Sequence, residues 1–283
     1  MPYIKSPMNY IGNKYRIINQ IEPLFPVECY RMVDLFCGGC DVTINAEAQE
    51  KYANDINYHV IDIFEEMQKR GLDYVLGYID ATIDHWQLSK TNEDGYKRLR
   101  EFYNKYHNPL DLYVLMCFSF NYQFRFNNAQ EYNNPFGRNR SSFNDRMRNN
   151  LIKMIPRLHG VNFSEKKFQD FDYSILQGGD FLYADPPYLI TTGSYNDGKR
   201  GFTGWGEKEE RDLYDILDML NKRGVRFALS NVSEHKGKKN DILIEWQEAQ
   251  GYNLHNIDFN YKNSNYHGKN TNKPTNEILV TNY

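Results

Sequence analysis

FLYADPPY, residues 181–188, is the most specific pattern in the sequence and the best indication of its fold. Its first four residues form an apolar run with the length of a buried strand, and two prolines then end the strand abruptly. Consecutive prolines fix φ and donate no backbone hydrogen, so they form a rigid turn with free carbonyl acceptors. The turn suits a planar amine, which Asp185 and the Pro186 carbonyl would bind while Tyr188 stacks on its ring. An ordinary Asx-Pro turn with a structural tyrosine is the alternative.

A glycine pair follows another predicted strand near the N-terminus. The strand covers residues 32–36, and Gly38 and Gly39 stand in the turn after it. Glycine allows positive φ and a close approach to a ligand at the carboxyl end of a strand, where open α/β sheets bind ligands. Asp55 comes about twenty residues after Asp34, where a carboxylate can accept both hydroxyls of a ribose. The GxGxxG loop of a dinucleotide site is absent, so the glycine pair favours a nucleoside without phosphate, such as S-adenosylmethionine.

Four segments of the chain together resemble the Dam-type DNA adenine methyltransferases, amino-methyltransferases that use S-adenosylmethionine. They stand in the order of that family as YIGNK at residues 10–14, DLFCGG at 34–39, NDIN at 54–57 and DPPY at 185–188. The resemblance spans nearly the whole chain. Asp in the first position of DPPY is typical of the adenine-N6 enzymes, whereas Ser is commoner in cytosine-N4 enzymes. Tyr10 and Asn13 replace a tryptophan and a glycine of many members, and both still allow an aromatic contact and a turn.

The motifs and the resemblance together assign roles to individual residues. The predicted cofactor-binding residues are Tyr10, Lys14, Asp34, Phe36, Gly38, Gly39, Asp55 and Asp185. The predicted catalytic residues are Asp185, Pro186 and Tyr188.

Residues 118–144 mix arginines, amides and aromatic rings, the side chains that read DNA bases. Arg reads guanine bidentately, Asn and Gln read adenine, and Pro and Phe contact a thymine methyl or wedge into a base stack. The segment resembles the Dam-type recognition hairpin, in which the positions of Arg125 and Pro135 read the target, usually GATC. The predicted DNA-binding residues are Phe120, Asn121, Arg125, Pro135, Arg138 and Arg140.

Positive charge is local rather than general in this chain. The 283 residues carry a net charge of −3, so DNA binding needs a local patch. Residues 138–153 hold five cations, among them Arg146 and Arg148, against one acid, which predicts phosphate contacts. A second basic stretch, residues 235–239, could serve the same purpose or form a solvated face.

The four cysteines include Cys37 and Cys40, whose CxxC spacing is that of redox and zinc sites. No second pair stands at ligand spacing, and the glycines between the two fit the cofactor loop, so we expect no metal and no redox chemistry. The sequence also shows no apolar run of about 18 residues and no signal peptide. We therefore expect no membrane contact, a cytoplasmic location in a bacterial or phage-infected cell, and a monomer or weak dimer.

Two α/β blocks flank a differently composed middle, which predicts one doubly wound, Rossmann-like α/β sheet with an inserted, mainly helical target-recognition domain. The S-adenosylmethionine-binding catalytic domain would cover residues 1–60 and 156–283, and the recognition domain residues 61–155. In the first block we expect a helix at residues 42–49 and then a short strand. In the second, apolar residues three and four apart predict a core-facing helix at residues 207–222. Further strands are expected at residues 225–229 and 278–281.

These observations predict a site-specific DNA methyltransferase that methylates N6 of adenine in duplex DNA, within GATC, after flipping the base out of the stack. The alternatives are an RNA adenine or cytosine-N4 methyltransferase, a catalytically idle DNA-binding protein on the same fold and, more distantly, a dinucleotide oxidoreductase. The arginine and asparagine hairpin argues against RNA, Asp185 against cytosine, the intact DPPY against an idle protein, and the missing diphosphate loop against an oxidoreductase. A role in restriction–modification, phage self-protection or gene regulation stays open.

Overall fold

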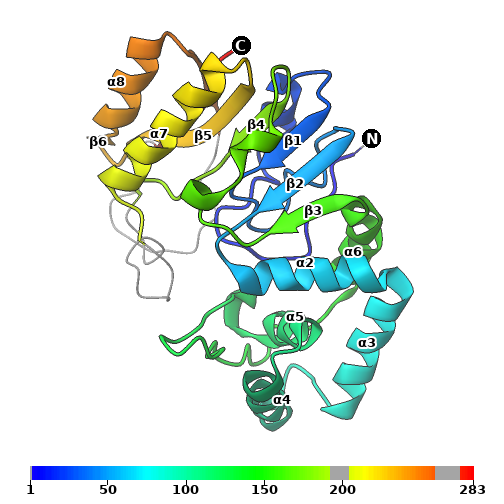
Figure 1. The fold of residues 1–283 in the computed structure, drawn as a ribbon. Coiled ribbons are helices and arrows are strands. Elements are labelled where there is room, and N and C mark those ends of the chain that lie inside the picture. The colour runs from blue at the N-terminus through cyan, green and yellow to red at the C-terminus, as the bar shows by residue number, and fades with distance from the viewer. Residues whose placement is uncertain (1, 192–203, 259–274) are drawn as a thin grey trace.

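A mixed sheet of eight strands forms the centre of the computed structural model, which describes residues 2–191, 204–258 and 275–283. In the described part of the chain the strand order is β3-β2-β1-β4-β5-β8-β7, with β6 paired to β5 (Figure 1). The strands are β1 (Arg31–Asp34), β2 (Glu50–Asn54), β3 (Val161–Ser164), β4 (Phe181–Ala184), β5 (Arg226–His235), β6 (Lys238–Lys239), β7 (Asn253–Ile257) and β8 (Thr275–Thr281). Strands β3, β2, β1, β4 and β5 run parallel, and β8 runs antiparallel to both of its neighbours. The predicted doubly wound α/β sheet is confirmed.

The strand order reverses direction between β1 and β4. From β1 the chain proceeds outward through β2 and β3, whereas β4 and β5 lie on the other side of β1. Ligands of such sheets bind at this switch point, beyond the carboxyl ends of the strands. Because β8 is antiparallel, its first residues lie at the same edge: Glu277 pairs with Val232 near the carboxyl end of β5.

Alternating side chains of the central strands bury both faces of the sheet. Leu182 and Ala184 of β4 belong to the core that contains Leu213 and Leu217 of α7 (Glu207–Lys222). Phe181 and Tyr183 point to the opposite face, where they pack with the isoleucines of α1 (Ile18–Ile21). Helix α7 begins and ends at the predicted residues. Helix α8 (Asp241–Gln250) packs beside α7 on the same side of the sheet (Figure 1).

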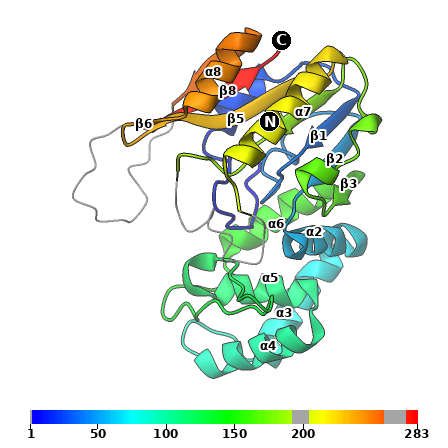
Figure 2. The same cartoon turned by 60° about the vertical axis from the view of Figure 1, so that its left-hand side comes forward.

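Five helices form a separate layer beyond the β2–β3 side of the sheet. They are α2 (Tyr58–Arg70), α3 (Leu72–His85), α4 (Glu93–Tyr106), α5 (Pro109–Phe118) and α6 (Asp145–Leu158). Helices α2 and α6 lie nearest the sheet and α4 farthest from it (Figures 1 and 2). Helix α5 contacts α2, α3 and α4, and every residue after its first proline is buried, as expected for a helix that is apolar on all sides. The layer agrees with a mainly helical insertion. The predicted limits of the recognition domain, residues 61 and 155, fall inside α2 and α6, so the division into domains stays a prediction.

The predicted helix at residues 42–49 is wrong. The segment forms turns with only isolated helix-type bonds, from Ile44 to Cys40 and from Ala46 to Val42, and its polar side chains bond to other parts of the chain. Thr43 donates to Asp34 Oδ2 from its hydroxyl at 2.6 Å and from its backbone N–H at 3.2 Å. Asn45 bonds to both backbone groups of Ile4. The strand predicted after it is confirmed as β2.

The remaining elements are short. The 3-10 turns are η1 (Glu22–Leu24), η2 (Phe120–Tyr122), η3 (Phe168–Asp170) and η4 (Tyr173–Ile175). Within the described ranges, no helix has the length and apolar character needed to cross a bilayer.

Candidate active site

A cavity of about 680 Å³ lies beyond the carboxyl ends of β1, β2 and β4. Loops of the sheet form most of its wall, and the segment after α5 contributes Gln123, Phe124 and Phe126. All of the predicted catalytic and cofactor-binding residues line it: Tyr10, Lys14, Asp34, Phe36, Gly38, Gly39, Asp55, Asp185, Pro186 and Tyr188. The volume is that of a small-molecule site. The fold therefore brings together, in one cavity, motifs from four separate segments of the chain.

The glycine loop after β1 is held against the N-terminal segment and the end of β2. Asp55 accepts the backbone N–H of Gly38 through Oδ2 at 2.9 Å and that of Asn57 through Oδ1 at 2.8 Å. Gly38 has φ +46°, and a Cβ there would lie only 2.7 Å from Cδ1 of Tyr10. Glycine is thus required at position 38 by both its backbone angle and the tyrosine ring above it. Burial raises the pKa of the Asp55 carboxyl, whose unused lone pairs can accept a ligand.

Asp34, at the end of β1, offers a buried acceptor to the cavity. Its Oδ2 accepts both donors of Thr43, whereas its Oδ1 has no hydrogen-bond partner among the described residues. Burial raises the pKa of this carboxyl to about 7. An unsatisfied buried acceptor is costly, so a ligand with an ammonium or N–H group would be stabilised here.

Three aromatic rings form an apolar wall of the cavity. Phe36, Phe168 and Trp205 contact one another with ring centroids 5.4–5.7 Å apart. Trp205 also donates its indole N–H to Glu210 at 2.6 Å, which fixes its orientation. A planar base would stack or pack edge-on against such a wall. The motifs identified Phe36 alone, since Phe168 and Trp205 stand in segments without a recognisable pattern.

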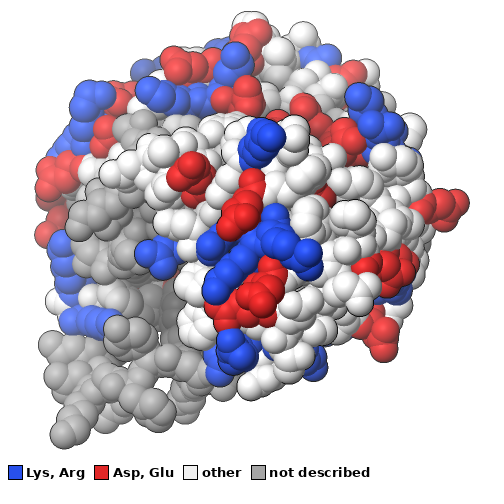
Figure 3. Space-filling model, turned by 90° about the horizontal axis from the view of Figure 1, so that it is seen from below, with Lys and Arg blue, Asp and Glu red and all other residues white. Residues whose placement is uncertain are grey.

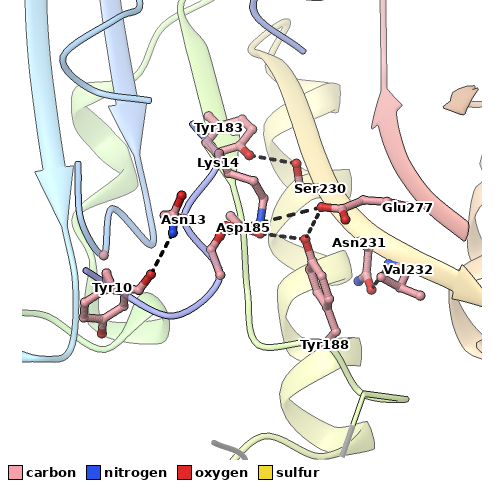
Figure 4. A network of polar contacts seen from close by, with 12 residues as sticks. Tyr10, Asn13, Lys14, Tyr183, Asp185, Tyr188, Ser230, Asn231, Val232 and Glu277 are labelled. Carbon is pink, nitrogen blue, oxygen red and sulfur yellow. Dashed lines mark hydrogen bonds and ion pairs between the residues drawn. The ribbon is translucent and has the colours of Figure 1, made fainter. Parts of the chain in front are cut away.

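A network of polar contacts surrounds Asp185, which also lines the cavity (Figure 4). Lys14 Nζ lies 2.7 Å from Asp185 Oδ2, and the Tyr188 hydroxyl donates to Asp185 Oδ1 at 3.1 Å. Glu277 of β8 approaches both donors, with Oε1 3.2 Å from the Tyr188 hydroxyl and 3.9 Å from Lys14 Nζ. Burial raises the pKa of the Asp185 carboxyl, and the Lys14 ammonium opposes that shift. Lys14, predicted to bind the cofactor, thus contacts the predicted catalytic carboxylate.

Glu277 was not found by sequence analysis. It is buried, yet it stands in an apolar strand without any motif around it. A charged residue inside a strand of buried positions is the one signal that could have drawn attention to it.

The predicted DNA-binding residues lie on the surface around an irregular hairpin. Phe120, Arg125 and Pro135 are exposed, and the Arg140 guanidinium lies over the Phe120 ring, 5.4 Å from its centroid. Asn121 has φ 56°, and its carbonyl accepts the side chain of Asn9 at 2.8 Å. The hairpin is fixed to the helical layer by Phe126, which stacks on His59 of α2 with centroids 3.8 Å apart.

Arg138 and Arg148 each pair with an acid within the described residues. Arg138 pairs with Glu93 and Arg148 with Asp80. On the face seen from below, a group of Lys and Arg side chains lies near the centre with acidic side chains directly beside it (Figure 3). Arg146 is exposed and has no carboxylate within ion-pair distance in the described ranges. The basic stretch 235–239 forms the turn between β5 and β6.

The cysteines of the CxxC segment are buried as free thiols in the glycine loop. Burial raises the pKa of both the Cys37 and the Cys40 thiol, which disfavours the reactive thiolate. In the part of the chain that the structure describes, no group of three or more His, Cys, Asp and Glu is arranged to hold a metal.

Comparison with known proteins gives matches along nearly the whole chain. Residues 10–273 match the family described as D12 class N6 adenine-specific DNA methyltransferase. Modification methylase StsI from Streptococcus sanguinis and Type II methyltransferase M.FokI from Planomicrobium okeanokoites are each 50% identical over 283 residues, covering 99% of this chain and 43% of the relative. DNA adenine methylase of Escherichia coli strain K12 is 23% identical, covering 96% of this chain and 93% of that protein. The chain therefore spans less than half the length of the first two relatives.

Proposed function

The chain belongs to the D12 class N6 adenine-specific DNA methyltransferases, and we propose that it transfers a methyl group from S-adenosylmethionine to N6 of an adenine in duplex DNA. The observation that carries this proposal is the shared cavity. Its lining includes the glycine loop with Asp34 and Asp55, here called the first end, and the Asp185 carboxylate with the adjacent Pro186 carbonyl, here called the second end.

The chemistry of the first end fits S-adenosylmethionine. Its ammonium group would satisfy the unpartnered Oδ1 of Asp34, and its ribose hydroxyls would donate to Asp55. Its adenine would pack against the wall of Phe36, Phe168 and Trp205. Bound in this way, the cofactor supplies an electrophilic methyl group on a sulfonium.

The second end fits the exocyclic amine of an adenine. N6 of adenine is paired within the duplex, so the base has to be flipped into the cavity. Asp185 and the Pro186 carbonyl would accept the two N6–H donors and Tyr188 would stack on the ring. This alignment directs the nitrogen lone pair toward the methyl donor and accounts for catalysis mainly by positioning. Once N6 has bonded to the methyl group it loses a proton, which Asp185 can accept because burial raises the pKa of its carboxyl.

The target sequence and the biological setting are finer questions. GATC stays a prediction from the hairpin resemblance, since the names of the relatives state no target. Two relatives at 50% identity are named modification and type II methyltransferases, which supports a role in restriction–modification. Because the chain spans 43% of those relatives, activity of this chain by itself is part of the proposal. A monomer or weak dimer likewise stays a prediction.

Methyl transfer can be tested with the purified chain, labelled S-adenosylmethionine and a mixture of duplexes that covers every sequence context of adenine. We expect N6-methyladenine in duplexes that share one short sequence, and none with Asp185→Ala. Mass spectrometry of the nucleosides distinguishes N6-methyladenine from N4-methylcytosine. If the chain binds cofactor and DNA but methylates neither adenine nor cytosine, the proposal is refuted and the idle DNA-binding alternative is supported.

A further inference from the structure

Glu277 is a buried acid that the reaction described above does not use. Its side chain is 4% exposed and reaches the catalytic turn from β8, 89 residues away from Tyr188 in the sequence. We propose that Glu277 is a positioning residue for methyl transfer: it receives the Tyr188 hydroxyl and the Lys14 ammonium while Asp185 holds the target amine. This inference rests on the proposed function.

The contacts of Asp185 create the need for such a residue. In the structure each carboxylate oxygen of Asp185 already has a donor, Tyr188 on Oδ1 and Lys14 on Oδ2 (Figure 4). A neutral amine is a weaker hydrogen-bond donor than an ammonium group, so N6 of adenine competes poorly for an oxygen that Lys14 holds at 2.7 Å. Asp185 can align N6 best when at least one of these donors is released.

The position of Glu277 allows that release without leaving a buried donor unpaired. The Tyr188 hydroxyl has one proton and lies almost equally far from Asp185 Oδ1, at 3.1 Å, and from Glu277 Oε1, at 3.2 Å. It can therefore donate to either acid by rotation of one bond, but not fully to both. Lys14 Nζ is 3.9 Å from Glu277 Oε1, which is within ion-pair distance but longer than its 2.7 Å contact with Asp185. Both donors of Asp185 thus have the same second acceptor.

The sheet gives Glu277 a fixed position. Strand β8 lies between β5 and β7, and Glu277 is in register with Val232 on one side and Ile257 on the other. A side chain on a strand paired on both edges is placed more accurately than one on a loop. Asp185 and Tyr188 belong to the turn after β4, so the acid on β8 supplies a stationary partner to that turn.

A double-mutant cycle tests this role. The variants are Glu277→Gln, which removes the charge and keeps the shape, Tyr188→Phe, which removes the hydroxyl, and their combination. Glu234→Gln is the matched control, because Glu234 is an acid of the neighbouring strand β5 that pairs with Asn276 at the same strand edge. Calorimetry with S-adenosylmethionine and thermal melting establish that each variant is folded, and Glu277→Asp is a second variant in case the glutamine is not tolerated.

We expect Glu277→Gln to lower kcat by about tenfold or more, with the Kd for S-adenosylmethionine and for duplex changed less than about twofold. In the Tyr188→Phe background the same substitution should have a clearly smaller effect, because residues that act through one hydrogen bond are not additive. Glu277→Asp should lose activity to an intermediate degree, and Glu234→Gln should match the wild type.

Two outcomes overturn the inference while the proposed function stands. One is a wild-type kcat in both Glu277 variants; the other is a kcat loss in the double variant equal to the product of the losses in Glu277→Gln and Tyr188→Phe. A wild-type chain that binds S-adenosylmethionine and duplex but transfers no methyl group would instead refute the proposed function, and this inference with it.

Discussion

Gly38→Ala is expected to damage the cofactor end of the cavity through two separable effects. The first is conformational, since φ is +46° and a residue with a Cβ in the left-handed region costs about 1–2 kcal/mol. The second is steric, because the new Cβ would lie 2.7 Å and 2.9 Å from two carbons of the Tyr10 ring, and overpacking of this kind costs about 1–3 kcal/mol. We therefore expect the free energy of unfolding to fall by about 2–5 kcal/mol, the sum of the two.

The same substitution should weaken cofactor binding. A shift of the loop would withdraw the Gly38 N–H from Asp55, the carboxylate expected to bind ribose. If a third of this energy, about 0.7–1.7 kcal/mol, is lost from the free energy of cofactor binding, the Kd for S-adenosylmethionine rises about 3- to 15-fold, since about 1.4 kcal/mol is tenfold in affinity. Chemical denaturation and calorimetry measure the two quantities.

Two controls separate the contributions to the Gly38→Ala effect. Gly160→Ala places a Cβ at φ +76° with nothing within 4 Å, so it should show the conformational part alone and leave cofactor affinity unchanged. In a Tyr10→Ala background the steric part should disappear. If Gly38→Ala lowers the free energy of unfolding no more than Gly160→Ala does, and leaves the Kd for S-adenosylmethionine unchanged, the close packing of Tyr10 on the loop has no energetic role.

Three further predictions concern other parts of the site. Asp55→Ala should raise the Kd for S-adenosylmethionine, and an unchanged calorimetric affinity would remove Asp55 as the ribose acceptor. Burial raises the pKa of Asp34 to about 7, so the folded state loses stability as pH rises from the pKa of the unfolded chain toward 7, while affinity for the cofactor should rise as the carboxylate forms. Asp34→Asn should flatten the pH profiles of both stability and cofactor affinity, and profiles parallel to those of the wild type would contradict the assignment. Arg125→Ala should relax selectivity at one base pair by about 1–3 kcal/mol, whereas Arg146→Ala should weaken all duplexes alike and reduce the salt dependence; equal losses on all sequences would make Arg125 a backbone contact.

The predicted site residues that the fold brings into one cavity depend on short stretches of sequence. The DPPY turn and Asp55 follow a strand directly and the glycine pair stands in the loop after β1, so local pattern and strand position are enough to place them at one edge of the sheet. The bounds of helix α7 agree with the prediction because its apolar positions follow one helical face and Gly224 stands just after its end.

The parts that were missed depend on contacts between distant segments. Glu277 reaches Tyr188 only because β8 runs antiparallel, which no local pattern indicates. The helix predicted at residues 42–49 fails for a similar reason, since the Thr43 side chain bonds to Asp34 across the loop. Arg138 was predicted as a DNA contact from its neighbours in sequence, and its pairing with Glu93 comes from packing of the hairpin against α4.

The antiparallel strand β8 also bears on the order in which the site assembles during folding. The cofactor loop and the DPPY turn are complete once β1, β2 and β4 have paired, whereas Glu277 arrives only when the last strand inserts between β5 and β7. Contacts between segments far apart in the sequence form slowly, because the intervening chain loses entropy before the contact stabilises it. The pairing of β1 with β4 joins Val33 to Leu182, a much longer separation than that between Val232 of β5 and Glu277 of β8, so the β1–β4 pairing is expected to be the slower step. A folding intermediate without it would lack the complete cavity even if β8 were already in place. Recovery of methyl transfer during refolding should then coincide with recovery of cofactor binding.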